Sequence, residues 1–322
     1  MNYRTLGKTG IQVSQLCFGT MSFGGDADEP TSQAMFRRCR ELGINFFDCA
    51  DIYAGGVSEQ ILGRLVADCR DELVLTTKVC MPRSEDVNDR GLSRRSLFLA
   101  IEASLKRLNT DRIEVYFAHH FDAATDMEVT LKAFDDLVRQ GKILHPAVSN
   151  WSAWQIALSL GICSQHDLAH FECIQPMYNL VKRQAEVEIL PLAAAQQIGV
   201  IPYSPLGGGL LTGKYSRTKK PDSGRIIENK MYDGRYADQM NYEVAERFTQ
   251  YAHQQGRHPA TLAVAWVMTH PAVTAPIIGA RNLEQLEPSL AAMDVDMTQD
   301  MREEISGLSV APPLATDRAE EG

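Results

Sequence analysis

The chain has 322 residues, of which 44% are hydrophobic and 23% charged, values that are ordinary for a globular protein. Its net charge of −9 argues against a nucleic-acid partner, because nucleic-acid binding needs a basic face, but leaves room for a basic pocket that takes one small anion. The polar start has no apolar signal-peptide core, and no apolar run is long enough to cross a membrane. Seven cysteines without a Cys-x-x-Cys pair are typical of reduced thiols. These features predict a cytoplasmic protein that does not associate with membranes.

The chain opens with a predicted β-hairpin over residues 3–13, which contains glycines suited to a turn. Short apolar strands and amphipathic helices then alternate. Thr31 and Ser58 are plausible N-caps of the first two helices, and Gly43 ends the first of them. In this half of the chain we expect strands at 15–20, 44–48, 73–78 and 113–118, and helices at 31–42, 58–66, 93–108 and 127–140.

The second half of the chain repeats this alternation. We expect strands at 147–149, 174–175, 200–203 and 275–278, and helices at 153–160, 187–197, 242–254, 259–268 and 283–292. Eight strands separated by helices predict an α/β protein with a closed (β/α)8 TIM barrel, which forms a single catalytic domain over residues 1–310. Two stretches break the alternation. Residues 207–235 predict a long functional loop, and the polar residues 311–322 predict a flexible C-terminal tail.

Several of the predicted strands end beside residues that can handle a proton. Asp48 and Tyr53 follow the second strand, Lys78 ends the third and His119 follows the fourth. In a parallel α/β barrel the carboxyl ends of all strands open onto one face, so these side chains should share a pocket. A nearby lysine would lower the pKa of the tyrosine, an aspartate would keep the lysine charged, and the histidine could hydrogen-bond a carbonyl oxygen. Taken singly, these residues could belong to turns or solvated strand ends, but together they indicate a proton-transfer site.

Two histidines stand side by side at the end of the fourth strand. Neighbouring strand residues point to opposite faces, and the inward positions Val115 and Phe117 favour His119 over His120 as the one that faces the barrel. His120 is either a rim residue or part of the site. A metal site of these histidines and Asp122 is disfavoured, because neighbours of opposite direction make a poor ligand set.

A glycine-rich segment, residues 208–215, contains the G-x4-G-K spacing of a P-loop. Tyr215 stands where a P-loop has the Ser or Thr that binds magnesium, which argues against a nucleoside-triphosphatase. We interpret the segment as a cradle of backbone amides that can approach a pyrophosphate, with an ordinary flexible loop as the alternative beyond Lys214.

The motifs at these strand ends resemble those of the aldo-keto reductase family, and the resemblance extends from Tyr3 to about Leu290. The segments that carry it are Leu16–Met21, Asn45–Tyr53, Thr76–Lys78, Tyr116–Asp122, Val148–Trp151, Gln175–Leu180 and Pro202–Gly207. The resemblance implies a (β/α)8 barrel that binds NADPH without a Rossmann fold and acts on a small-molecule carbonyl substrate. It also implies that Tyr53 is the proton donor, that Asp48 and Lys78 tune it, and that His119 orients the carbonyl.

The resemblance further implies a set of cofactor contacts. Ser149, Asn150 and Gln175 would hold the nicotinamide carboxamide, and Tyr203 would stack on the ring, roles that suit amide-edge recognition and an aromatic face. The stretch from Ser204 to Lys214 would run along the pyrophosphate. The full set of expected cofactor-binding residues is Gly19, Thr20, Met21, Asp48, Ser149, Asn150, Gln175, Tyr203, Ser204, Pro205, Leu206, Gly207, Gly209, Lys214, Gly279, Arg281, Gln285 and Ser289.

Cofactor preference depends on the residues after the eighth strand. Arg281 could pair bidentately with a 2′-phosphate and so select NADPH over NADH, and a solvated arginine at a helix start is the alternative. Ser289 stands where the family usually has an adenine-binding asparagine. The strictness of the preference for NADPH is therefore left open.

These observations predict an NADPH-dependent reductase of aldehydes or ketones, with no resident metal. The second hypothesis is an NADPH-binding sensor that resembles the β-subunits of voltage-gated potassium channels, disfavoured by the lack of a long N-terminal extension. The third, a metal-dependent barrel hydrolase, would need a bound ion. The physiological substrate, the stereochemistry and the oligomeric state stay open.

Overall fold

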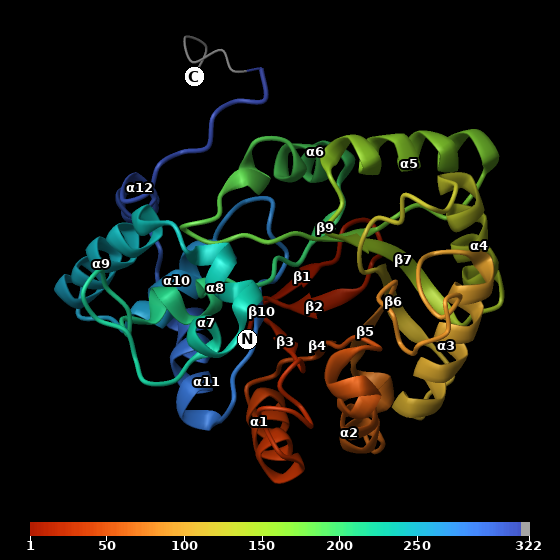
Figure 1. Cartoon of the computed structure of the whole chain (residues 1–322), viewed down its shortest axis with the longest axis horizontal. Helices are drawn as coiled ribbons and strands as arrows, with labels where there is room; N and C mark the ends of the chain where they lie inside the picture. The colour runs from red at the N-terminus through yellow and green to blue at the C-terminus, as the bar shows by residue number, and fades with distance from the viewer. Residues whose placement is uncertain (317–322) are drawn as a thin grey trace.

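The computed structural model describes residues 1–316 and shows the predicted (β/α)8 barrel (Figure 1). Its eight parallel strands follow the order β10-β3-β4-β5-β6-β7-β8-β9, so that neighbours in the chain are neighbours in the sheet. The backbone N–H groups of Thr274 and Ile277 donate to the carbonyls of Val200 and Pro202, at 2.8 and 2.9 Å, and join the last strand to the one before it. The strands are β3 (Cys17–Gly19), β4 (Phe46–Asp48), β5 (Val74–Val79), β6 (Ile113–Ala118), β7 (Ile143–Ser149), β8 (Cys173–Gln175), β9 (Gly199–Val200) and β10 (Ile277–Ile278).

The barrel interior is filled by side chains of alternating strand residues. In β6, Val115 and Phe117 belong to the inner cluster, whereas Tyr116 packs with the residues beneath the helices. The inner cluster consists of Leu6, Val13, Cys17, Phe46, Val74, Val115, Phe117, Ala147, Cys173, Ile201, Ala275 and Ile277. Because the interior is packed, a functional site has to lie at the strand ends.

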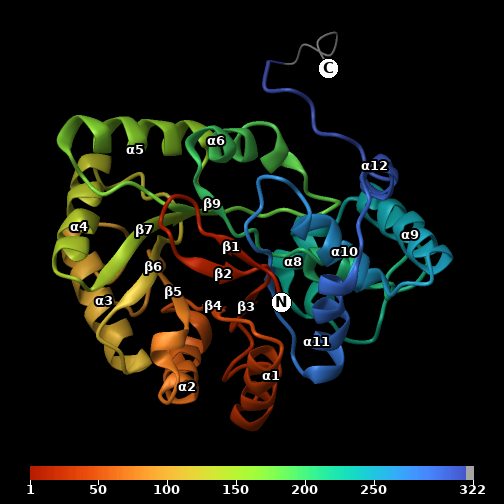
Figure 2. The same ribbon diagram turned by 180° about the vertical axis from the view of Figure 1, so that it is seen from behind.

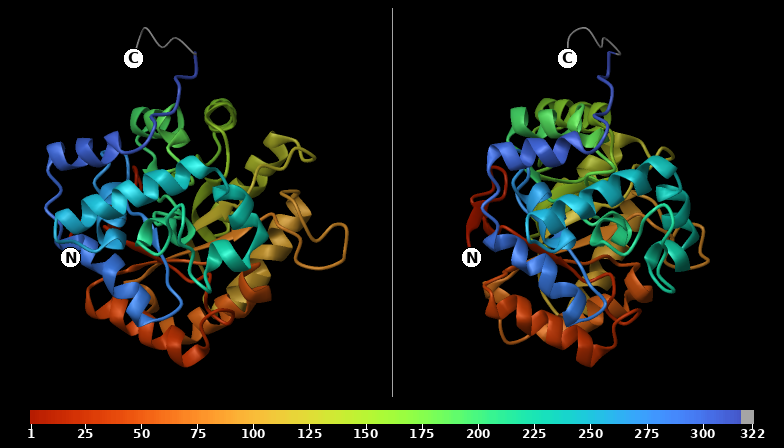
Figure 3. Two further views of the ribbon diagram at one scale, coloured as in Figure 1. Left: turned by 60° about the vertical axis from the view of Figure 1, so that its left-hand side comes forward. Right: turned by 90° about the vertical axis from the view of Figure 1, so that its left-hand side faces the viewer.

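Amphipathic helices surround the strands, as Figures 1 and 3 show. In α3, the buried residues Leu97, Ile101, Leu105 and Leu108 lie on one stripe that packs against the barrel. The helices are α1 (Glu29–Glu41), α2 (Val57–Val66), α3 (Arg94–Leu108), α4 (Met127–Arg139), α5 (Ala153–His166), α6 (Ile189–Gln196), α7 (Arg225–Glu228), α8 (Lys230–Tyr236), α9 (Gln239–Gln254), α10 (Pro259–Met268), α11 (Leu283–Leu290) and α12 (Gln299–Gly307).

The predicted N-terminal hairpin, β1 (Tyr3–Thr5) and β2 (Gln12–Ser14), lies across one end of the barrel, in front of the strands in Figure 2. Leu6 and Val13 pack into the inner cluster. The backbone N–H of Ser14 donates to Asn45 Oδ1 at 2.8 Å, just before β4 begins. The hairpin thus closes the amino-terminal end of the strands, and the opposite end is left for a site.

Two predicted helix caps are wrong. The cap of α1 is Asp28, whose carboxylate accepts from the backbone N–H of Thr31. The helix begins two residues earlier than expected, at Glu29, with Pro30 in its first turn. The cap position of α2 is held by Gly56 in a left-handed conformation. Ser58 is instead buried inside the helix, and its hydroxyl donates to the Thr20 carbonyl at 2.8 Å.

The second half of the chain departs from the predicted pattern in three places. The expected loop at 207–235 contains the 3-10 helix Gly207–Thr212 together with the short helices α7 and α8. The first buries only Ile226, and the second buries Tyr232 and Tyr236. Helix α12 was not predicted. Of the expected tail, residues 311–316 form no helix or strand, and 317–322 lie outside the described residues. Within residues 1–316, no helix combines the length and the apolar character that crossing a membrane requires.

Candidate functional site

The predicted proton-transfer residues lie at one end of the barrel. Asp48 is the last residue of β4, Lys78 is the next-to-last of β5, and His119 follows β6. The register pairs Asp48 with Thr76 and Lys78 with Phe117, so these strand ends are level with one another. Tyr53 follows β4 by five residues, in the 3-10 turn Tyr53–Gly56. Residues spread over 71 positions of sequence therefore meet at the carboxyl ends of three neighbouring strands.

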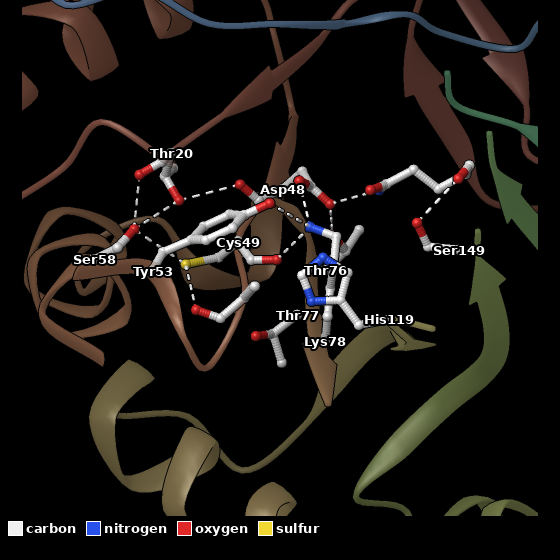
Figure 4. Close-up of polar contacts among 12 residues, drawn as sticks. Thr20, Asp48, Cys49, Tyr53, Ser58, Thr76, Thr77, Lys78, His119 and Ser149 are labelled. Atoms are coloured by element: carbon white, nitrogen blue, oxygen red, sulfur yellow. Dashed lines mark hydrogen bonds and ion pairs between the residues drawn. The ribbon is translucent and has the colours of Figure 1, made fainter. Parts of the chain in front are cut away.

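The amine of Lys78 is the centre of this cluster. It is fully buried and donates to Asp48 Oδ2 at 2.6 Å, to the Cys49 carbonyl at 2.7 Å and to the Tyr53 hydroxyl at 3.3 Å. Figure 4 shows the amine between the Asp48 carboxylate and the Tyr53 ring. Three acceptors use the three donors of an ammonium group, so this site is built for a charged lysine.

The carboxylate of Asp48 is held from several sides. Its Oδ1 accepts from Thr76 Oγ1 at 2.7 Å and from Gln175 Nε2 at 2.9 Å, while Oδ2 binds Lys78. Thr76 was not predicted as part of the site. It lies two residues before Lys78 in β5, so the alternation of strand side chains already places it on the same face as the lysine.

The charges in the cluster decide the ionisation of the lysine and the tyrosine. Burial opposes the charged form of Lys78, but the Asp48 carboxylate and Tyr53 together outweigh it, and the pKa of Lys78 lies above its usual value. Burial raises the pKa of Tyr53 to about 12, with Lys78 lowering it and Asp48 raising it. Lys78 lowers the pKa of Tyr53, as expected, but burial has the larger effect, and the pKa lies above its usual value. The tyrosine therefore keeps its proton at neutral pH.

His119 is neutral at this site. Burial, with the charge of Lys78 nearby, lowers the pKa of His119 to about 2. Its ring lies edge-on to Tyr53, with 6.3 Å between the ring centroids, and its buried Nδ1 has no hydrogen-bond partner among the described residues. His120 is exposed, which agrees with the first of its two predicted positions, at the rim. Asp122, the third residue of the disfavoured metal site, uses its carboxylate to accept hydrogen bonds from Leu92 N and Thr125 Oγ1, at 2.8 and 2.7 Å.

A second group of polar side chains lies at the ends of β7 and β8. Ser149 donates to the Gln175 carbonyl at 3.0 Å. Asn150, in a left-handed conformation with φ 59°, donates to the His119 carbonyl at 3.0 Å and accepts from the Tyr203 hydroxyl at 2.7 Å. Because Gln175 also binds Asp48, this group is joined to the proton-transfer cluster by hydrogen bonds.

The segment after β9 contains several residues with positive φ. Ser204 has φ 57°, and Gly207, Gly208 and Gly209 have φ 59°, 66° and 100°. A Cβ atom on Gly208 would lie only 2.8 Å from the Tyr232 ring, so this backbone has to be glycine. Pro205 and Leu206 lie within the same turn, and Lys214 is exposed just beyond the 3-10 helix. The backbone turns as the predicted anion cradle requires, but Gly207 is buried, Gly208 and Gly209 are half-buried, and the N–H groups of Gly207 and Gly209 donate to the Ser204 and Leu206 carbonyls.

Arg281 does not lie free in solvent at the start of α11. Its guanidinium donates to Asp26 at 3.1 Å and to Glu228 of α7 at 2.7 Å. Arg281 N donates to Gln285 Oε1 at 3.3 Å. A phosphate bound by Arg281 would have to compete with these two carboxylates, which the sequence did not indicate.

The remaining predicted cofactor-binding residues differ in how far they are exposed to solvent. Met21 and Gly279 are exposed at the ends of β3 and β10, whereas Gly19 is buried at the end of β3. Thr20 is fully buried, and its hydroxyl donates to the Asp48 carbonyl at 3.1 Å and accepts from Ser58. Ser289 is fully buried, and its hydroxyl has no partner among the described residues. Such an unsatisfied group is costly unless something else binds it.

Comparison with known proteins gives this site its context. A model of the Aldo/keto reductase family matches residues 15–309. The chain is 35% identical to the uncharacterized oxidoreductase YrpG of Bacillus subtilis (strain 168), over 99% of each chain. It is 34% identical to a probable voltage-gated potassium channel subunit beta of Oryza sativa subsp. japonica, over 98% of this chain and 99% of the relative. It is 31% identical to norsolorinic acid reductase of Aspergillus flavus, over 95% of this chain and 79% of the relative. The match over almost the whole chain, on a (β/α)8 barrel with this cluster at its strand ends, shows that the protein belongs to the aldo/keto reductase family.

Proposed function

We propose that the protein is an NADPH-dependent reductase of aldehydes or ketones, and that residues 1–310 act as one catalytic domain. The observation that carries the proposal is the Lys78 amine, which binds Asp48 at 2.6 Å and the Tyr53 hydroxyl at 3.3 Å. When bound, NADPH supplies the hydride. Tyr53 donates its proton to the carbonyl oxygen, and Lys78 stabilises the phenolate that is left. Neutral His119 hydrogen-bonds the same oxygen.

The residues present suit the proposed cofactor. The amide and hydroxyl groups of Ser149, Asn150 and Gln175 form a polar edge beside the proton-transfer cluster, and the orphaned hydroxyl of Ser289 offers a further polar contact. Of the glycine turns at 207–209, the N–H groups of Gly207 and Gly209 already donate to Ser204 and Leu206, so an anion would have to bind at the half-buried Gly208 and the residues after it. Arg281 would bind the 2′-phosphate. These groups would bind the nicotinamide, pyrophosphate and adenosine parts of NADPH.

The proposal is tested first by titrating the purified protein with NADPH and following the quenching of the protein's fluorescence. Oxidation of NADPH is then measured at 340 nm in the presence of a panel of aldehydes and ketones. We expect both binding and turnover. Failure to bind NADPH would contradict the assignment of the cofactor residues. Binding without turnover of any carbonyl would contradict the reductase and support a regulatory role.

We expect Arg281→Met to weaken NADPH binding about tenfold to a hundredfold, the usual loss for a charge-assisted hydrogen bond. NADH has no 2′-phosphate and should bind the variant as it binds the wild type. The two dissociation constants, measured by titration at one salt concentration, check this. An equal loss for both cofactors would show that Arg281 acts by closing the Asp26–Glu228 contact rather than by binding phosphate.

The turnover number for reduction should not change from about pH 5 to about pH 9. Tyr53, with a pKa of about 12, keeps its proton over this range, and His119, with a pKa of about 2, stays neutral. Activity is lost only as the pH rises toward the tyrosine pKa, because the proton donor is then consumed. The pKa of Asp51, which burial and Glu59 raise to about 7, falls in this range, but Asp51 pairs with Arg83 at 3.4 Å rather than with the reacting groups, so we expect its titration to leave turnover unchanged. A change in the turnover number near pH 6.5 that is still present in Asp51→Asn would contradict the assignment of His119 as an uncharged group.

A second candidate function follows from the relatives named as potassium channel β-subunits. Their identity to this chain, 34% and 35%, is close to the 35% of the oxidoreductase relative, so similarity does not separate the two functions. We propose NADPH-dependent regulation of a partner as the alternative. It would be favoured by a partner that binds the protein with NADPH and dissociates when NADP⁺ replaces it.

A further inference from the structure

The proposed proton donor lies at the start of an unusual turn. Ala54, Gly55 and Gly56, which follow Tyr53, have φ of 48°, 63° and 92°, so three residues in succession are left-handed before α2 begins. An alanine adopts this conformation only when its surroundings impose it. The position of the Tyr53 hydroxyl therefore depends on whatever holds this turn.

A buried carboxylate lies directly behind the turn. Glu59, in the first turn of α2, is fully buried. Its Oε1 accepts from Thr77 Oγ1 at 2.5 Å, and its Oε2 accepts from Arg107 Nε of α3 at 2.6 Å. Thr77 is the neighbour of Lys78 in β5 and points to the opposite face of the strand. Glu59 thus ties the strand that carries the lysine to α3, from the side away from the substrate.

Arg107 makes direct contact with the turn itself. A Cβ atom placed on Gly56 would lie 3.0 Å from Arg107 Cδ and 3.1 Å from its Nε, so the arginine side chain packs on the backbone of Gly56. Its guanidinium is fixed by Glu59 and by Ser104 Oγ at 3.2 Å. One ion pair therefore touches both the turn that bears Tyr53 and the strand that bears Lys78.

We propose that Glu59 and Arg107 are positioning residues, which set the 3.3 Å contact between the Tyr53 hydroxyl and the Lys78 amine. They act through the turn 53–56 and through Thr77, and they touch neither the substrate nor the proton. The proposal rests on the proposed role of Tyr53 as proton donor. A displaced donor slows the chemical step without weakening cofactor binding, since small misplacements of a reacting group have large effects on rate.

The chain provides a matched control in a second buried ion pair. Glu114 binds Arg70 at 2.9 Å and also accepts from the backbone of β5, at Leu75 N, two residues before Thr77. Its side chain is 7% exposed, against 0% for Glu59. This pair lies at the amino-terminal ends of β5 and β6, far from Tyr53 along the strands. Glu59→Gln and Glu114→Gln therefore make the same chemical change at buried positions, and only the first touches the turn.

The experiment compares the two variants by turnover, NADPH binding and hydrogen exchange of the peptide that covers residues 53–57. For Glu59→Gln we expect the turnover number to fall about 10- to 100-fold, with an unchanged NADPH dissociation constant and faster exchange in that peptide. For Glu114→Gln we expect lower thermal stability with wild-type turnover and exchange. Wild-type turnover in Glu59→Gln, unchanged exchange of the turn, or an equal loss of turnover in Glu114→Gln would overturn the proposal.

A second variant covers the case in which Glu59→Gln folds poorly. Glu59→Gln combined with Arg107→Met removes the unpaired charge, which commonly restores the stability lost with a buried ion pair. It does not restore the bonds that hold the turn, so we expect turnover to stay low. Recovery of wild-type turnover in this double variant would also overturn the proposal. If the wild type reduces no carbonyl, the proposed function fails, and the exchange of residues 53–57 still tests the anchoring on its own.

Discussion

Tyr53→Phe is expected to lower kcat/KM for carbonyl reduction at least about a hundredfold, the usual contribution of a positioned general acid. Phenylalanine fills the same space but has no proton to give as negative charge develops on the carbonyl oxygen. The hydroxyl also accepts from the Lys78 amine at 3.3 Å, and that amine keeps its bonds to Asp48 and the Cys49 carbonyl in the variant. NADPH should therefore bind as it does to the wild type, which fluorescence titration checks.

The control for this variant is Tyr116→Phe, on the neighbouring strand β6. Tyr116 is fully buried on the outer face of the strand, and its hydroxyl has no partner among the described residues. Removing that hydroxyl should leave turnover and stability close to those of the wild type. Turnover retained in Tyr53→Phe would show that another group, with His119 the first to examine, protonates the carbonyl.

The parts of the site that strand periodicity controls were predictable from the sequence. Asp48, Lys78 and His119 each end a short apolar run, and the barrel brings such ends together whatever the loops between them do. The alternation that placed Val115 and Phe117 inside also placed His119 rather than His120 toward Tyr53. The family match to residues 15–309 agrees with the resemblance in these same motifs.

The parts that depend on contacts distant in the chain were not predictable. Arg281 meets Asp26 and Glu228 across 255 and 53 positions of sequence, and Glu228 lies in a segment without any helical stripe. The pKa of Tyr53 is decided by a balance in which burial outweighs the lysine, and a sequence gives no measure of burial at a turn. Ser58 was mistaken for a cap because its hydroxyl binds Thr20, which is 38 positions away.

Lys78→Met is expected to cost about 3–5 kcal/mol in the free energy of unfolding, because it leaves Asp48 as a buried carboxylate without its cation. Both side chains are almost completely inaccessible, at 0% and 3% exposure, so water cannot replace the lysine. The pKa of Lys78 in the folded protein lies above its usual value, so this stabilisation is fully present at neutral pH and is lost only as the pH rises through the folded pKa. Denaturant unfolding of the variant and the wild type measures the difference.

The double variant Asp48→Asn/Lys78→Met separates the stability of this pair from its role in the reaction. With both charges removed, most of the lost stability should return, since the unpaired carboxylate is what makes the single variant unstable. Carbonyl reduction should stay at least about a hundredfold below the wild type, because no cation remains beside Tyr53 to stabilise the phenolate. A double variant that regained both properties would mean that Lys78 only neutralises Asp48. One that regained stability alone would show that this buried charge is kept for chemistry, at a position where an uncharged pair would fold equally well.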